Sequence, residues 1–331
     1  MRTVTLNPVA DEAANWYQYP GTGSHFEKVD EAEANGDTDR IYTETLNALD
    51  RFTLDDIPAD FGTSCAVRIK VWARVASGGA RNVRVGLVIG GAVVAWETKS
   101  IAVGAEYTCY EFTNVAWDAI FWEKDWAGAA ISIECLQSGY TVRVTKVAVE
   151  VDYYTLWIAK PNGDIATAWS KYPAGDPDNH YSRVDEGCDT HNGNTDGVYT
   201  QTPGNVDQFA VEDAPGSFLA SKGVEVRLVA KDLASSDDEL TLKPVVGGED
   251  QAGATIQNMT TDFVLYRASH ANWQNQDWTR AELDAASLKM QFDQIGKGTY
   301  AKRVTAIELA VSYDNRAVRG SVLTPALIEV L

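Results

Sequence analysis

The most constraining feature of this chain is a phrase that it contains twice. Val29–Thr43 reads VDEAEANGDTDRIYT, and Val184–Thr200, which starts 155 residues later, reads VDEGCDTHNGNTDGVYT. Other pairs occur in the same order: WYQYP and WSKYP before the phrase, FTLDDIP and FAVEDAP after it, and finally RVTKVAVEVDY and RVTAIELAVSY. Landmarks that recur in one order indicate a tandem duplication. We therefore expect the second half of the chain to adopt the fold of the first.

The duplication predicts three parts: a first repeat over residues 1–155, a second repeat over residues 156–315, and a C-terminal segment over residues 316–331. The junction lies near the turn-forming sequence Pro161-Asn162-Gly163. The period is far longer than the 20–50 residues of a solenoid repeat. The sequence therefore predicts two domains in series.

Segments with apolar residues at alternate positions, such as Val67–Val75, dominate each repeat. This alternation is typical of half-buried β-strands, and the Gly-Gly pairs that end VRVGLVIGG and LTLKPVVGG suit tight hairpins. We therefore expect an all-β protein of two tandem jelly-roll-like antiparallel β-sandwiches arising from the internal duplication. The β-branched residues of Arg143–Tyr153 and Arg303–Tyr313 predict central strands. Thr279 and Glu282 predict the capping box of one short helix.

Charge and hydropathy exclude several classes of partner. The net charge of −19 repels phosphate backbones, so we expect no nucleic-acid binding. No run approaches the ~18 consecutive apolar residues that a membrane-spanning helix requires, so we expect no membrane partner. The start of the sequence, Met1-Arg2-Thr3-Val4, lacks the apolar region of a signal peptide. It predicts synthesis and folding in a cytoplasm.

The repeated acidic phrase offers oxygen ligands at close spacing, which a hard cation such as Ca²⁺ prefers. The candidate calcium ligands are Asp30, Glu31, Asp37 and Asp39 in the first repeat and Asp185, Glu186, Asn194 and Asp196 in the second. The alternative is a turn between strands whose carboxylates cap backbone amides or face water. The phrase is not an EF-hand, because it has no Glu at the twelfth position. No other cofactor is expected.

Aromatic residues also recur between the repeats. Trp16 and Tyr19 correspond to Trp169 and Tyr172. Exposed rings at these positions would stack on a glycan, whereas buried rings would close one end of each sandwich. Both alternatives stay open from sequence alone.

The sequence contains no recognisable set of catalytic residues. It has no HExxH zinc motif, no Gly-x-Ser-x-Gly nucleophile elbow, no P-loop and no dinucleotide fingerprint. The carboxylate pair Asp55-Asp56 is compatible with glycosidase chemistry, but a sequence does not give the carboxylate separation that this chemistry requires. We expect a protein that is not an enzyme.

The C-terminal segment is apolar in an otherwise acidic protein. A frayed tail is one interpretation, but burying this segment against a domain or a neighbouring subunit would remove much apolar area from water. The predicted interface residues are Val322, Leu323, Leu327, Ile328, Val330 and Leu331, with Arg316 and Arg319 available to acidic groups.

The repeated Trp, the VDE phrase, the FTLDDIP segment, the Gly-Gly hairpin and the closing RVTKVAVEVDY strand together resemble β-sandwich domains of virion structural proteins from tailed bacteriophages. The resemblance covers residues 10–153 and 163–313. It implies a non-enzymatic head-decoration, neck, tail or fibre component, assembled in the host cytoplasm and located in the virion. The implied partners are other virion proteins of the capsid, neck or tail, and copies of the chain itself. The alternative is a carbohydrate-binding module that recognises a glycan on the host surface.

Overall fold

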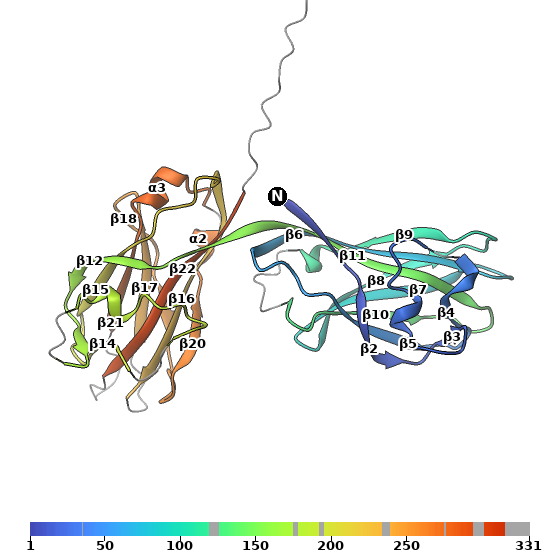
Figure 1. The fold of residues 1–331 in the computed structure, drawn as a ribbon, viewed down its shortest axis with the longest axis horizontal. Coiled ribbons are helices and arrows are strands. Elements are labelled where there is room, and N and C mark those ends of the chain that lie inside the picture. Colours follow the sequence, from blue (N-terminus) through green and yellow to red (C-terminus); the bar gives the residue numbers. More distant parts are fainter. Residues whose placement is uncertain are drawn as a thin grey trace, which may run out of the picture. The chain divides into compact units, whose positions relative to one another are not determined.

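The computed structural model describes residues 1–34, 36–118, 126–174, 178–191, 195–233, 239–274, 276–293 and 301–314. The chain divides into two compact units, unit 1 over Met1–Leu156 and unit 2 over Trp157–Leu331 (Figure 1). The division falls one residue from the junction that the duplication predicts. The C-terminal segment with its candidate interface residues lies outside the described residues, so its assigned role stays a prediction.

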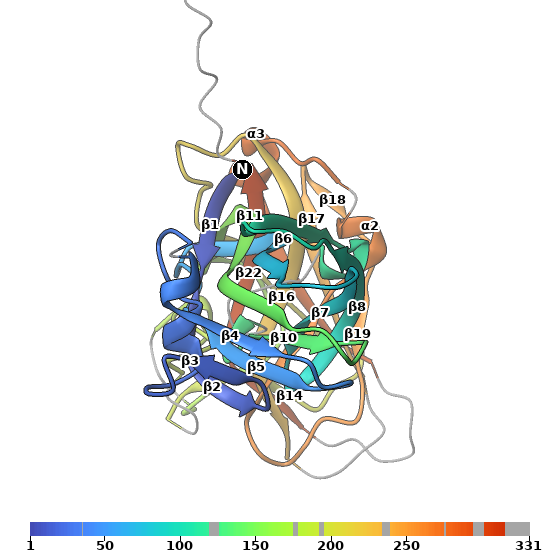
Figure 2. The ribbon, with the colours of Figure 1, turned by 90° about the vertical axis from the view of Figure 1, so that its right-hand side faces the viewer.

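Unit 1 contains two antiparallel sets of strands. One set has the order β3 (Tyr17–Tyr19), β4 (Arg40–Thr43), β11 (Val142–Ala159), β6 (Phe61–Val75) and β9 (Thr108–Thr113), and β1 (Arg2–Leu6) pairs with a later part of β11. The other set has the order β2 (Pro8–Ala14), β5 (Leu49–Leu54), β10 (Ala130–Cys135), β7 (Arg81–Ile89) and β8 (Ala92–Ile101). Figure 2 shows β3 alongside β4.

Unit 2 uses the same strand orders. One set runs β13 (Ser170–Tyr172), β14 (Gly197–Thr200), β22 (Lys302–Asp314), β16 (Ala220–Asp232) and β20 (Val264–Ala268). The other runs β12 (Pro161–Thr167), β15 (Val206–Val211), β21 (Ser287–Asp293), β17 (Glu239–Val246) and β18 (Glu249–Asp250), with β19 (Ala254–Ile256) also on β17. The expectation of an all-β, antiparallel protein is confirmed.

The alternating pattern of each strand places one row of apolar side chains between the two sets. In unit 1 the core joins Ile41 and Val147 of one set to Phe52 and Ile131 of the other. Unit 2 has a core of the same construction, in which Phe209 occupies the position of Phe52. Both phenylalanine side chains are fully buried. Each unit is therefore two layers of strands around its own hydrophobic core.

Repeated landmarks occupy equivalent positions. Arg143 of β11 pairs with Tyr42, and Arg303 of β22 pairs with Tyr199. Both long strands lie between neighbours on each side, so the predicted central position is confirmed. The Gly-Gly pairs also form the predicted hairpins. Gly90-Gly91 and Gly247-Gly248 each join two antiparallel strands with positive φ at both glycines, the conformation that a type I′ turn requires.

Short helices connect some of the strands. The single-turn 3-10 helices are η1 (Phe26–Lys28), η2 (Gly36–Thr38), η3 (Val115–Trp117) and η4 (Tyr181–Arg183), and the α-helices are α2 (Ala271–Gln274) and α3 (Arg280–Asp284). The capping box before α3 is confirmed, because Thr279 and Glu282 bond to each other's backbone amides. Within the described ranges, no helix combines the length and the apolar character needed to cross a bilayer.

Candidate functional site

One histidine in each repeat is hydrogen-bonded to a buried aspartate. In unit 1, His25 Nδ1 lies 2.7 Å from Asp50 Oδ2, while Asp50 Oδ1 accepts hydrogen bonds from the amides of Asn15 and Trp16 at 2.6 and 2.8 Å. A second aspartate, Asp11, accepts the backbone amides of His25 and Phe26. The cluster ties β2, β5 and the turn before η1 together. We call the His25–Asp50 pair the unit 1 brace.

Unit 2 has a closely similar arrangement. His180 Nδ1 lies 3.1 Å from Asp207 Oδ2, and Asp207 Oδ1 accepts the Trp169 amide at 2.8 Å. Asp164 accepts the amides of His180 and Tyr181. The side chains of Asp50 and Asp207 are fully buried. Because the second oxygen of each aspartate also accepts a hydrogen bond from a backbone amide, each His–Asp pair joins separate segments of its unit.

The hydrogen bond to Asp50 raises the pKa of His25, and the charges of Asp50 and Asp11 act in the same direction against the effect of burial. A histidine whose folded pKa is raised stabilises the fold fully below its ordinary pKa of about 6.5, and this contribution is lost as the pH rises through the folded pKa. We therefore expect the melting temperature of unit 1 to fall above neutral pH. Calorimetry from pH 5.5 to 9 checks this.

The matched variant is His25→Asn, whose amide NH₂ can still donate to Asp50 but does not titrate. Its melting temperature is expected to change less with pH over the same range. A profile as steep as that of the unsubstituted protein would place the titrating group elsewhere.

In unit 1 the predicted calcium ligands contact cationic side chains. Asp37 accepts hydrogen bonds from Arg74 and from Arg143 (3.1 Å) and forms an ion pair with Arg40. Asp39 pairs with Lys28 at 3.4 Å. In the described ranges, no three His, Cys, Asp or Glu side chains come together as a metal site. The expectation that these aspartates converge on one cation is thus not met there, because arginine and lysine already balance their charge.

The remaining calcium candidates lie in the same loops. Burial raises the pKa of Asp30 and of its counterpart Asp185. Asp196, the counterpart of Asp39, pairs with Arg183 at 3.6 Å, as Asp39 does with Lys28. Glu31 and Glu186 are half-buried, and Asn194 lies outside the described residues. The loops of both units therefore contain a carboxylate–cation pair at the same position, which neither the calcium interpretation nor the turn alternative predicted.

The structure separates the aromatic candidates into two kinds. Trp16 and Trp169 are each 3% exposed, and their ring nitrogens donate to backbone carbonyls of Ala48 and Asn205. They close the core and are not available for stacking on a glycan, which corrects that part of the prediction. Tyr19 and Tyr172 are 50% and 41% exposed, so their rings do reach solvent.

Next to Tyr19 lies a larger surface feature that the sequence did not single out. Tyr17 of β3 pairs with Tyr42 of β4, Tyr42 pairs with Arg143 of β11, and Arg143 pairs with Arg74 of β6. Residues directly opposite one another across antiparallel strands point to the same face. These four residues, the aromatic–arginine row, therefore run side by side on the outer face of the sheet. The rings of Tyr17 and Tyr42 are 5.6 Å apart.

A second pair of residues lies beside the row on β3 and β4. Tyr19 pairs with Arg40, and the Arg40 guanidinium lies 4.4 Å from the centre of the Tyr19 ring and 6.0 Å from that of Tyr42. Arg40, Arg74 and Arg143 all surround the carboxylate of Asp37, which also accepts the Tyr107 hydroxyl at 2.9 Å. The guanidinium of Arg74 is the main reason that the pKa of Asp37 falls to about 2. We call Arg40, Arg74 and Arg143 the arginine cluster.

Unit 2 contains a reduced version of the row. Tyr199 pairs with Arg303, and Arg303 pairs with Lys231, so an aromatic residue is again followed by two cations. Ser170 and Gly197 take the places of Tyr17 and Arg40. The Arg303 guanidinium lies 3.6 Å from the ring centre of Tyr172. The sequence did carry a signal for these residues, since the Tyr of RIYT and GVYT and the Arg of both RVT segments recur in the duplication.

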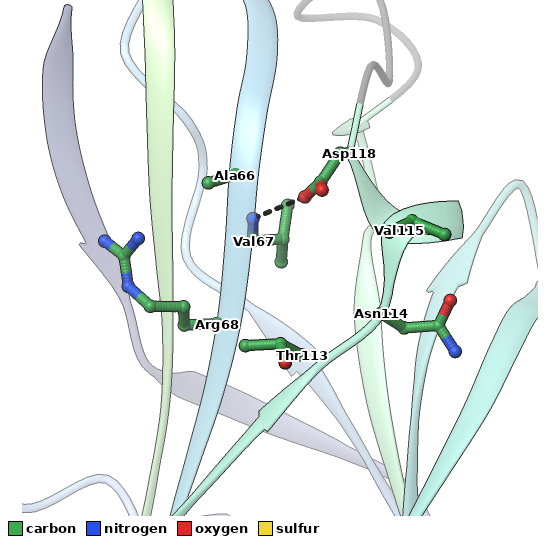
Figure 3. Close-up of a pocket in the computed structure, with 7 residues that line it drawn as sticks. All are labelled: Ala66, Val67, Arg68, Thr113, Asn114, Val115 and Asp118. Carbon is green, nitrogen blue, oxygen red and sulfur yellow. Dashed lines mark hydrogen bonds between the residues drawn. The ribbon is translucent and has the colours of Figure 1, made fainter.

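A cavity of about 230 Å³ opens beside β6 and β9, lined by Ala66, Val67, Arg68, Thr113, Asn114, Val115 and Asp118 (Figure 3). The charged side chains that line this cavity form hydrogen bonds with other groups of the protein. Asp118 Oδ1 accepts the Val67 amide at 2.9 Å, and Arg68 donates to Asp152 at 2.8 Å. The cavity therefore presents no pair of groups placed for acid–base or nucleophilic chemistry.

No protein-family model matches the chain, and none of the curated proteins matches it significantly. Among solved structures, the chain is similar to the tandem CBM22-1–CBM22-2 domain of Paenibacillus barcinonensis Xyn10C, with 9% identity, a TM-score of 0.26, and 90% of this chain and 94% of that chain covered. It is also similar to allantoicase from Saccharomyces cerevisiae, with 11% identity, a TM-score of 0.27, and 92% and 90% covered. The CBM36-1 domain of a xylanase from the hindgut metagenome of Trinervitermes trinervoides shows 9% identity and a TM-score of 0.26, with 46% and 97% covered. Likenesses at these scores support no inference about ligand or activity.

Proposed function

We propose that this chain is a non-enzymatic carbohydrate-binding protein built from two tandem, jelly-roll-like β-sandwich repeats that arose by duplication. The observation that carries the proposal is the aromatic–arginine row of unit 1. Tyr17 of the row is 58% exposed, Tyr19 beside it is 50% exposed, and the Arg40 guanidinium lies 4.4 Å from the centre of the Tyr19 ring. Aromatic faces beside hydrogen-bond donors are what a sugar ring with its hydroxyl groups requires.

The repeated contacts of the histidine–aspartate pairs support the non-enzymatic part of this proposal. Both pairs hold backbone amides, and both recur with the same partners in the two units. A catalytic site is seldom needed twice in one chain, whereas a brace is needed once in every copy of a fold. The same equivalence supports duplication as the origin of the two units.

An array of neutral and acidic glycans tests the carbohydrate-binding proposal. Binding by the intact chain is expected to be weakened by Tyr17→Ala, a change at an exposed position that leaves the core intact. Absence of binding to every glycan on the array would refute the proposal.

A second candidate is a structural component of a tailed-phage virion, in the head, neck, tail or fibre, for which a glycan-binding role in host recognition would be compatible. The net charge of −19 favours it, because mutual repulsion keeps a protein used in many copies soluble before assembly. Its partners would be other virion proteins and copies of itself, with residues 316–331 as the docking segment. Mass spectrometry of purified particles tests the assignment, and normal incorporation of a chain lacking residues 316–331 would exclude that segment as the interface.

A further inference from the structure

We propose that the aromatic–arginine row of unit 1 binds an acidic saccharide through the carboxylate of a uronic acid residue, and that Asp37 occupies part of this site as an internal competitor. The inference rests on the proposed carbohydrate-binding function and specifies its ligand class. It is carried by the charge of the arginine cluster, by the order of groups along the row, and by the exposure of Asp37.

The arginine cluster holds more positive than negative charge. Arg40, Arg74 and Arg143 carry three guanidinium groups, and in the described part of the chain their ion pairs all go to the single carboxylate of Asp37. This local excess of two positive charges stands in a protein of net charge −19. A cationic patch on an acidic protein is the part of its surface that attracts an anionic group of a ligand.

The order of side chains along the row matches a saccharide better than a simple anion. Adjacent strands lie about 4.8 Å apart, so the row presents two rings, then two guanidiniums, over three strand spacings. A sugar ring placed on Tyr17 and Tyr42 brings a carboxylate on the same or the next sugar to Arg143 and Arg40. Guanidinium groups bind carboxylates through two parallel hydrogen bonds, which adds geometric selectivity.

Asp37 lies on the solvent side of the arginine cluster. Its side chain is 51% exposed, whereas those of Arg40 and Arg74 are 13% and 10% exposed. Because its pKa is about 2, Asp37 is ionised at any working pH. It therefore offers the arginines the same chemical group that a uronate would bring, and it repels an approaching carboxylate. Removing its charge is expected to strengthen binding of the ligand.

The reduced row of unit 2 predicts one such site per chain. Ser170 replaces the exposed ring of Tyr17, and Gly197 replaces Arg40. Backbone crowding keeps Gly197 in place, since a Cβ there would lie 2.5 Å from the carbonyl oxygen of Val304. Substitutions at Tyr17 and Arg40 therefore change the unit 1 site alone.

Isothermal titration of the full chain with tetragalacturonate, and with the same tetrasaccharide methyl-esterified at its carboxylates, tests the proposal. Tetragalacturonate is expected to bind with a stoichiometry of one and at least about 10-fold more tightly than the ester, which offers the same rings without charge. Equal affinity for the two probes would overturn the carboxylate assignment while leaving carbohydrate binding intact. Binding of neither probe, when other glycans on the array bind, would also overturn it.

Three variants separate a binding role from a structural one. Arg40→Gln is expected to lower tetragalacturonate affinity about 10-fold, and Asp37→Asn to raise it about 5-fold. A purely structural Asp37 would give no gain. Arg84→Gln is the matched control, because Arg84 stacks on Trp96 and pairs with Glu134 on the other sheet of unit 1; its affinity is expected to stay unchanged.

Two further measurements distinguish an acidic saccharide from other anionic ligands. If Arg40→Gln lowers the melting temperature, Tyr17→Ala is used instead, because Tyr17 is an exposed ring. This variant is expected to lower tetragalacturonate affinity about 10-fold. A tetraglutamate peptide that binds as tightly as tetragalacturonate, with no effect of Tyr17→Ala, would assign the row to acidic peptides and overturn the saccharide proposal.

Discussion

Replacing Asp232 with valine is expected to destabilise unit 2 by about 3–5 kcal/mol. Asp232 forms an ion pair with Lys302, and both side chains are completely buried. Removing the carboxylate leaves the ammonium group in a low-dielectric interior, where the cost of desolvating a charge exceeds that of losing a hydrogen bond. Chemical denaturation followed by tryptophan fluorescence measures the loss.

The chain itself supplies the control for this prediction. At the same register in unit 1, Val75 pairs with Val142, where unit 2 pairs Asp232 with Lys302. The double variant Asp232→Val/Lys302→Val recreates the apolar pair of unit 1. It is expected to recover most of the stability that either single variant loses. A double variant as unstable as the sum of the two single variants would show that the two charges do not stabilise each other.

The ion pair illustrates what the sequence predicted and what it did not. The duplication and the alternation of Val67–Val75 predicted antiparallel strands, the central position of β11 and β22, and the hairpins at the Gly-Gly pairs, because these follow from local period and turn chemistry. Lys302 and Asp232 are far apart in sequence and read as ordinary surface charges. Only the pairing of β16 with β22 brings them together inside the protein.

The candidate site was predicted less well, for a related reason. Trp16 and Tyr19 are three residues apart in one repeated phrase, yet one is buried and the other exposed. Trp16 is held by Asp50 and Ala48, whereas Tyr19 pairs with β4, and sequence alone does not give these tertiary contacts. Asp37 looked like a calcium ligand because its neighbours in sequence are acidic, but its neighbours in space are arginines from β4, β6 and β11.

The second large loss of stability is expected on substitution of Asp50, the aspartate of the unit 1 brace. Asp50 is fully buried and accepts three hydrogen bonds, from the amides of Asn15 and Trp16 and from His25. Asp50→Ala leaves these donors inside the protein without an acceptor. Each unsatisfied buried donor costs about 1–3 kcal/mol, so we expect a total loss of about 3–5 kcal/mol in unit 1. For a domain of this size that corresponds to a fall in melting temperature on the order of 10 °C.

Asp50→Asn distinguishes the hydrogen-bonding geometry of the brace from its charge. The amide oxygen of asparagine can still accept from the Asn15 and Trp16 amides, and its NH₂ can donate to a neutral His25. We therefore expect this variant to lose about 1 kcal/mol and to lose the dependence of stability on pH that protonated His25 confers. Calorimetry gives the stability, and hydrogen exchange in β2 and β5, compared with exchange in β12 and β15, shows whether the loosening is confined to unit 1. If asparagine costs as much as alanine, the negative charge of Asp50 is what holds the brace, and its amide contacts are secondary.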